Sequence, residues 1–205
     1  MSHHALIVIL ILTSYSIRAQ EVFSGRLSFS IEYLKVPDDM KGVEAKLPTE
    51  VKIITDGKSW RSEQITEING KYSRVYIDSK DSIFETITIG PERVRVSYRK
   101  ISSVDVKSIN GLGPIVLGQE TEICEISDDD GIKQSINQLM SYSEIPNLFF
   151  NGLSGIPTVI EIDNAGIKMR LKLTSMSNEP LDETYFALPD DYKVIDTALY
   201  QSWLR

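Results

Sequence analysis

The sequence predicts a mostly β protein of the α+β class: a large curved antiparallel sheet, or half-open β-barrel, covered by one or two short helices. Apolar and polar residues alternate with a period of two in many short segments, which is typical of half-buried strands. Turn signals such as Asp56-Gly57 and Asn69-Gly70 separate these segments at regular spacing, as in an antiparallel meander. A sheet with one apolar face needs that face covered, so we expect it to curve around its cover.

The first strands follow one another closely. Leu27, Phe29, Ile31 and Tyr33 alternate with polar residues, and a loop over 34–48 follows them. Five further strands are then expected, separated by Asp56-Gly57, Asn69-Gly70, 79–81 and Gly90-Pro91, over Val51–Thr55, Lys58–Ile65, Tyr72–Ile77, Ile83–Ile89 and Arg93–Ile101.

The second half is less regular. Glu120–Ile126 resumes a strand after the glycine- and proline-rich break at 111–114. The apolar spacing of Ile132, Ile136, Leu139 and Met140 predicts a helix over 132–140, preceded by an acidic run. Two strands, Thr158–Ile162 and Ile167–Thr174, and a short terminal helix over 194–204 complete the expected elements.

The N-terminus is typical of a secretory signal peptide. Ala5–Leu12 is an unbroken apolar run, polar residues follow it, and Ala19 supplies a small residue for cleavage before Gln20. The run is much shorter than the ~20 residues of a membrane span, so we do not expect an integral membrane protein. The alternative interpretation of the apolar run Ala5–Leu12 is a buried N-terminal strand. We therefore expect a signal peptide over 1–19, a single domain over 20–205, and a periplasmic or secreted protein without a lipidated cysteine.

Charge and histidine content exclude several functions for the exported chain. Removal of 1–19 takes away Arg18 and leaves 21 basic against 29 acidic residues, a net charge of −8, which argues against nucleic acid as a partner. His3 and His4 leave with the signal peptide, so histidine-dependent catalysis and histidine-ligated zinc are excluded. Cys124, the single cysteine, lies in an apolar stretch and is expected in the core. We expect no enzyme and no cofactor.

Two local patterns are candidates for a functional site. Asp128-Asp129-Asp130 offers carboxylates for Ca²⁺, but it lacks the alternating spacing of a calcium loop, and capping of the expected helix explains it. Apolar residues in the glycine-flanked segment 145–157 can form a lid over a cavity, with core packing as the alternative. The candidate cavity and lid residues are Trp60, Tyr76, Tyr98, Ile136, Met140, Leu148, Phe149 and Phe150. For the aromatic members, cross-strand pairing is the competing interpretation.

Several short motifs resemble a family of exported bacterial proteins of unknown function that is common in Bacteroidetes. They are the opening strand Phe23–Tyr33, the turn Thr55–Lys58, Gly155-Ile156-Pro157 before a strand, and the closing segment Phe186–Tyr192. The resemblance implies a fold like that of the outer-membrane lipoprotein carriers LolA and LolB, a half-open β-barrel closed by helices over a hydrophobic cavity. It implies no catalytic residue, and no carrier ligand-binding residue can be matched.

These observations predict a binding protein or carrier for a hydrophobic ligand such as a lipid or acyl chain. The alternative is a structural or interaction protein of the cell envelope, with a filled core and an unknown protein partner. A carboxylate-based hydrolase would need two carboxylates about 5–10 Å apart across a cleft. Nothing in the sequence singles out such a pair.

Overall fold

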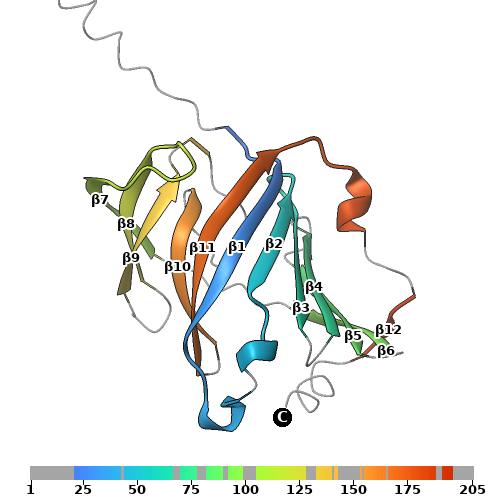
Figure 1. Ribbon diagram of the computed structural model, residues 1–205. Helices are drawn as coiled ribbons and strands as arrows, with labels where there is room; N and C mark the ends of the chain where they lie inside the picture. Colours follow the sequence, from blue (N-terminus) through green and yellow to red (C-terminus); the bar gives the residue numbers. More distant parts are fainter. Residues whose placement is uncertain are drawn as a thin grey trace, which may run out of the picture.

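The computed structural model describes residues 21–42, 44–66, 70–77, 82–89, 92–98, 105–127, 133–139, 141–142, 153, 155–164, 166–187 and 191–195. Its strands form one sheet (Figure 1) with the order β12-β6-β5-β4-β3-β2-β1-β11-β10-β9-β8-β7. The strands are β1 (Gly25–Lys35), β2 (Glu50–Thr55), β3 (Trp60–Thr66), β4 (Gly70–Ile77), β5 (Ser82–Ile89), β6 (Glu92–Tyr98), β7 (Asp105–Leu112), β8 (Thr121–Ser127), β9 (Lys133–Leu139), β10 (Ile156–Asn164), β11 (Ile167–Asn178) and β12 (Lys193–Val194). The predicted mostly β class is confirmed.

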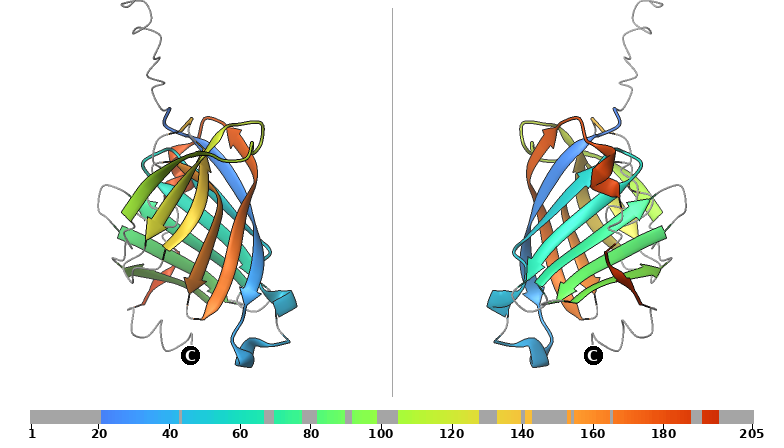
Figure 2. Two further views of the ribbon diagram at one scale, coloured as in Figure 1. Left: turned by 90° about the vertical axis from the view of Figure 1, so that its left-hand side faces the viewer. Right: turned by 90° about the vertical axis from the view of Figure 1, so that its right-hand side faces the viewer.

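The sheet consists of two meanders joined at β1 and β11. β1 to β6 follow one another across one half, and β7 to β11 return from the far edge to β1. Tyr98 at the end of β6 and Asp105 at the start of β7 are separated by seven Cα–Cα steps, which span at most about 24 Å. The two ends of the strand order must therefore approach each other. The sheet is strongly curved but not closed, and its halves face one another (Figure 2).

The central pair β1–β11 shows how the alternation sets the fold. Phe29 lies opposite Leu173, and Ile31 lies opposite Leu171. Leu171 and Leu173 are buried, whereas Lys172 between them and Thr174 after them are exposed. One face of the sheet is therefore the core face, as the sequence predicts, and the other faces outward.

The Asp56-Gly57 turn is confirmed between β2 and β3. Asp56 Oδ1 accepts hydrogen bonds from the backbone N–H groups of Lys58, at 2.8 Å, and Ser59, at 2.6 Å. Gly57 has φ = +85°, a conformation that favours glycine. Thr55 Oγ1 accepts from Gly57 N–H and donates to the Ser59 carbonyl. These bonds fix the register that places Trp60 opposite Thr55.

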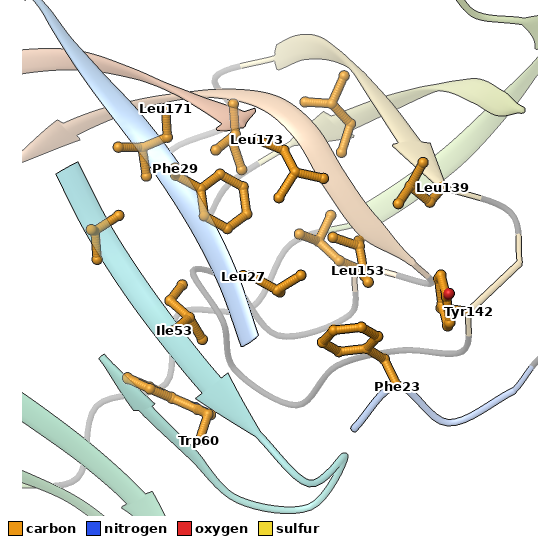
Figure 3. Packing of buried hydrophobic residues seen from close by; sticks show 14 of the residues in the cluster. Phe23, Leu27, Phe29, Ile53, Trp60, Leu139, Tyr142, Leu153, Leu171 and Leu173 are labelled. Atoms are coloured by element: carbon orange, nitrogen blue, oxygen red, sulfur yellow. The ribbon is translucent and has the colours of Figure 1, made fainter. Parts of the chain in front are cut away.

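A buried core lies inside the curve (Figure 3). Sixteen buried residues form one cluster, each exposing at most 8% of its surface. They are Phe23, Leu27, Phe29, Val51, Ile53, Trp60, Cys124, Ile126, Ile136, Leu139, Tyr142, Leu153, Ile156, Ile160, Leu171 and Leu173. Strands of both meanders contribute to this cluster, which is therefore one continuous core.

The predicted helix over 132–140 is wrong, because Lys133–Leu139 is strand β9. Ile136 lies opposite Cys124 of β8. Positions 132, 136 and 140 share a face at a period of two as well as at a helical period, so the apolar spacing alone was ambiguous. In the fold, the Gln134 side chain donates to the Glu161 carbonyl at 2.9 Å and accepts from Glu161 N–H at 3.1 Å. These side-chain bonds continue the pairing of β9 with β10.

Helical structure in the described residues is limited to short 3-10 turns. η1 (Asp38–Met40) and η2 (Glu44–Lys46) lie in the expected loop between β1 and β2. η4 (Glu183–Phe186) packs over β3 and β4 on the outer face, where Arg61 Nη1 donates to the Tyr185 carbonyl at 3.2 Å. The expected terminal helix is wrong at its start, since Val194 belongs to β12, and the residues beyond 195 lie outside the described range. No helix within the described ranges has the length and apolarity of a membrane span.

Candidate functional site

The backbone register brings three predicted site residues into one row across β3, β4, β5 and β6. Trp60 lies opposite Tyr76, Tyr76 opposite Ile83, and Ile83 opposite Tyr98. Residues directly opposite one another share a face of the sheet. Trp60 exposes only 4% of its surface and belongs to the core cluster, so this row lies on the inner face. The register thus places Trp60, Tyr76 and Tyr98 in one row, the aromatic row, with Ile83 between the two tyrosines.

A polar row lies next to the aromatic row on the same face. Ser62 lies opposite Arg74, and Arg74 lies opposite Glu85. The row begins at buried Ile53 of β2 and ends at Val96 of β6. An arginine and a glutamate therefore occupy neighbouring inner-face positions in the middle of the half-sheet.

A second apolar row lies beyond the polar one. Tyr72 of β4 lies opposite Ile87 of β5, and Ile87 lies opposite Val94 of β6. On β3 the polar Gln64 lies opposite Tyr72, so apolar positions flank the polar band on both sides only over β4 to β6. We define this surface, over rows Trp60–Tyr98, Ser62–Val96 and Tyr72–Val94, as the inner-face site. Mostly apolar walls with a few fixed polar groups are typical of small-molecule sites.

Arg74 and Glu85 were missed at the level of the sequence. Arg74 has the same parity as Tyr72 and Tyr76, and Glu85 has the same parity as Ile83 and Ile87. That shared parity was a usable signal, because every second residue of a strand lies on one face. Only the register shows that the two charged positions are neighbours.

The interior beside β8 to β11 is packed with the protein's own side chains. Ile136, a predicted cavity residue, is buried in the core cluster together with Cys124 and Ile126. Cys124 is buried as expected, and burial is the main cause that raises its pKa to about 12, with Glu122 adding to the shift. A thiol with such a pKa is not a nucleophile at neutral pH.

Three residues outside the strands also belong to the core cluster. Phe23 precedes β1, Tyr142 follows β9, and their rings meet edge to face with centroids 5.3 Å apart. Leu153 joins them in the core cluster (Figure 3). The sequence did not single out Phe23 as part of a cover. The predicted lid residues Met140, Leu148, Phe149 and Phe150 lie outside the described residues, as does Asp128-Asp129-Asp130.

An ion-pair network occupies the outer face of β1, β11 and β10. Arg170 contacts Glu32 at 3.1 Å and Glu161 at 2.7 Å, and Lys168 contacts Glu161 at 2.8 Å. Hydrogen bonds from Lys168, and then from Arg170, lower the pKa of Glu161. All four side chains are partly exposed, so this network is best explained as cross-strand pairing. Over the described residues, no three His, Cys, Asp or Glu side chains are placed to hold a metal ion.

Comparison with known proteins supports the fold. No family model matches the chain, and a search of curated proteins found no match. Among solved structures, the chain is similar to PNGF-II, described as "Structure of PNGF-II in C2 space group", with a TM-score of 0.53 and 11% sequence identity. The match covers 87% of this chain and 32% of the PNGF-II chain, so this chain spans about a third of that protein. At this identity the likeness shows a shared β architecture.

Proposed function

We propose that this protein is an exported binding protein that holds a hydrophobic or amphipathic ligand, such as a lipid or acyl chain, at the inner-face site. The observation that carries the proposal is the register, which aligns Trp60, Tyr76, Ile83 and Tyr98 in one row on the inner face. Export is expected from the apolar run Ala5–Leu12 and the small residue Ala19. The resemblance to the exported family with a carrier-like fold also supports an exported protein that binds a hydrophobic ligand.

The polar band defines the kind of ligand that fits best. Apolar rows on either side offer burial of an aliphatic chain, which contributes ~25 cal/mol per Å² of apolar area removed from water. Arg74 and Glu85 are opposite in charge and in neighbouring positions, so the band is neutral as a whole. A neutral band that offers both donors and acceptors suits a polar, uncharged or zwitterionic headgroup.

The binding test begins with native mass spectrometry and lipid extraction of protein purified from its own cell envelope. Near-stoichiometric lipid is expected to co-purify. A titration with a fluorescent fatty acid then compares the wild type with Tyr98→Ala, which should weaken binding at least tenfold. Ser97→Ala is the matched control, because position 97 lies on the opposite face of the same strand. Absence of co-purified lipid together with no uptake of the probe would overturn the proposal.

A second candidate is an interaction protein of the cell envelope without a ligand. The observation that favours it is the packed cluster of sixteen residues between the two meanders, which fills that part of the interior. This function predicts that neither lipid nor probe binds, and that cross-linking in the intact envelope captures one protein reproducibly. Ligand binding and cross-linking therefore distinguish the binding protein from the interaction protein.

A further inference from the structure

The connection between β7 and β8 continues the hairpin beyond both strands. Gly113 N–H donates to the Thr121 carbonyl at 2.9 Å, and Thr121 Oγ1 donates to the Pro114 carbonyl at 2.8 Å. Val116 and Gln119 exchange two backbone hydrogen bonds, at 3.0 and 2.9 Å. These bonds leave Leu117-Gly118 as a two-residue turn at the tip. The connection is therefore an ordered, hydrogen-bonded projection.

The turn places a leucine where the backbone disfavours one. Leu117 has φ = +50° and Gly118 has φ = +76°. Positive φ at both central positions is the type I′ pattern, in which asparagine or aspartate followed by glycine is favoured. Leu117 is the only non-glycine residue with positive φ among those the structure describes. An apolar side chain at this tip thus goes against the local backbone preference, and such outliers are frequently connected with function.

Three large apolar side chains of this projection are open to solvent. Leu112 is 78% exposed, Ile115 is 74% exposed and Leu117 is 47% exposed. They account for half of the six exposed large hydrophobic residues found among the described side chains. We call Leu112, Ile115 and Leu117 the apolar tip. Clustered exposed apolar residues mark surfaces that meet another molecule or a membrane.

We propose that the apolar tip docks on a lipid surface with neutral, zwitterionic headgroups. A stable protein interface needs about 800 Å² and some 20–30 residues on each side, far more than three side chains on one hairpin supply. Apolar side chains enter a lipid surface without a complementary shape on the other side. The exposed Glu120 next to the tip and the net charge of −8 of the exported chain, with 21 basic and 29 acidic residues once Arg18 is removed, disfavour an anionic surface.

The tip lies at one defined end of the folded body. Glu21 N–H donates to the Ser141 carbonyl, two residues beyond Leu139, and Leu139 lies opposite Thr121 at the base of the hairpin. Glu21, the first described residue, therefore lies at the same end of the folded body as the tip. This surface is independent of the proposed ligand, because the inner-face site takes no part in it.

The test is co-sedimentation with phosphatidylcholine vesicles of the chain purified after export, from which the expected signal peptide over 1–19 has been removed. Leu112→Ser, Ile115→Ser and Leu117→Asn are combined in one variant, in which asparagine also relaxes the turn. We expect its partition coefficient to fall at least tenfold, with an unchanged melting temperature. Leu34→Ser is the matched control, because Leu34 is an exposed leucine near the other end of β1, and it should change partitioning less than twofold.

Three results would overturn the proposal. The wild type would fail to sediment with neutral vesicles, or the triple variant would sediment equally well, or binding would require anionic lipid. A fourth outcome would reassign the surface: if light scattering shows a wild-type dimer that the triple variant loses, the occupant of the tip is a second copy of the chain. An Ile115→Trp variant, whose added emission should shift to the blue with vesicles, gives a readout separate from sedimentation.

Discussion

Trp60 on β3 lies directly opposite Tyr76 on β4, and this pair links the packed core to the inner-face site. Trp60 belongs to the buried cluster on one side and to the aromatic row on the other. A ligand held along that row would therefore change the environment of the Trp60 indole. The pair provides a spectroscopic reporter at the boundary between a filled interior and the proposed site.

The first prediction uses that reporter. The chain has two tryptophans, so Trp203→Phe leaves Trp60 as the sole emitter. We expect saturable quenching of its fluorescence by a brominated fatty acid, with affinity rising about fourfold for each added CH₂, because each buried CH₂ contributes about 0.8 kcal/mol. Steady-state fluorescence titrations with brominated fatty acids of increasing chain length measure both the quenching and the affinity. Tight binding without any quenching would place the ligand away from the aromatic row.

The second prediction concerns the core. Phe29 is fully buried between its neighbours Leu173 on β11 and Val51 on β2. Phe29→Ala is expected to lower the free energy of unfolding by about 3–5 kcal/mol, since it removes a buried ring and leaves a cavity. Urea denaturation followed by circular dichroism measures the loss. Lys172→Ala, at an exposed position on β11, is the control and should stay within about 0.5 kcal/mol of the wild type.

The third prediction is a pH dependence from Glu161. Its pKa is lowered in the folded state, so its contribution to stability is complete above the unfolded pKa of about 4.3 and is lost as the pH falls through the folded value. The partly exposed pairs with Lys168 and Arg170 contribute at most about 1 kcal/mol each. Thermal melts between pH 7 and pH 3 should therefore show a smaller acid-induced loss in Glu161→Gln. Parallel curves for both proteins would contradict this assignment.

The fourth prediction concerns Cys124. Burial raises the pKa of its thiol to about 12, so the reactive thiolate is scarce at pH 8 and the sulfur is inaccessible as well. We expect the native protein to react with a disulfide reagent at least a hundredfold more slowly than the urea-unfolded chain. Absorbance of the released thiolate follows the reaction. Rapid labelling of the native protein would show that the core near β8 opens readily.

The sequence alone determined where most strands lie. The alternation through Ile167–Thr174 predicted β11, and Asp56-Gly57 predicted the β2–β3 turn, because period-two burial and turn chemistry are local properties. Burial of Cys124 followed from its apolar neighbours in the same way. The helix predicted over 132–140 was wrong because the spacing of Ile132, Ile136 and Met140 fits both the period of a strand and the period of a helix. The local pattern therefore could not choose between the two.

Only the tertiary structure decided which residues are neighbours across strands. The register that aligns Trp60, Tyr76 and Tyr98, and that sets Arg74 opposite Glu85, depends on which hydrogen bonds form between the neighbouring strands β3 to β6, and periodicity alone does not specify them. The joining of β1 to β11, and the curvature that brings the two meanders face to face, also require long-range pairing. Sequence periodicity fixes the face on which a residue lies, but the residue opposite it is set by which strands meet.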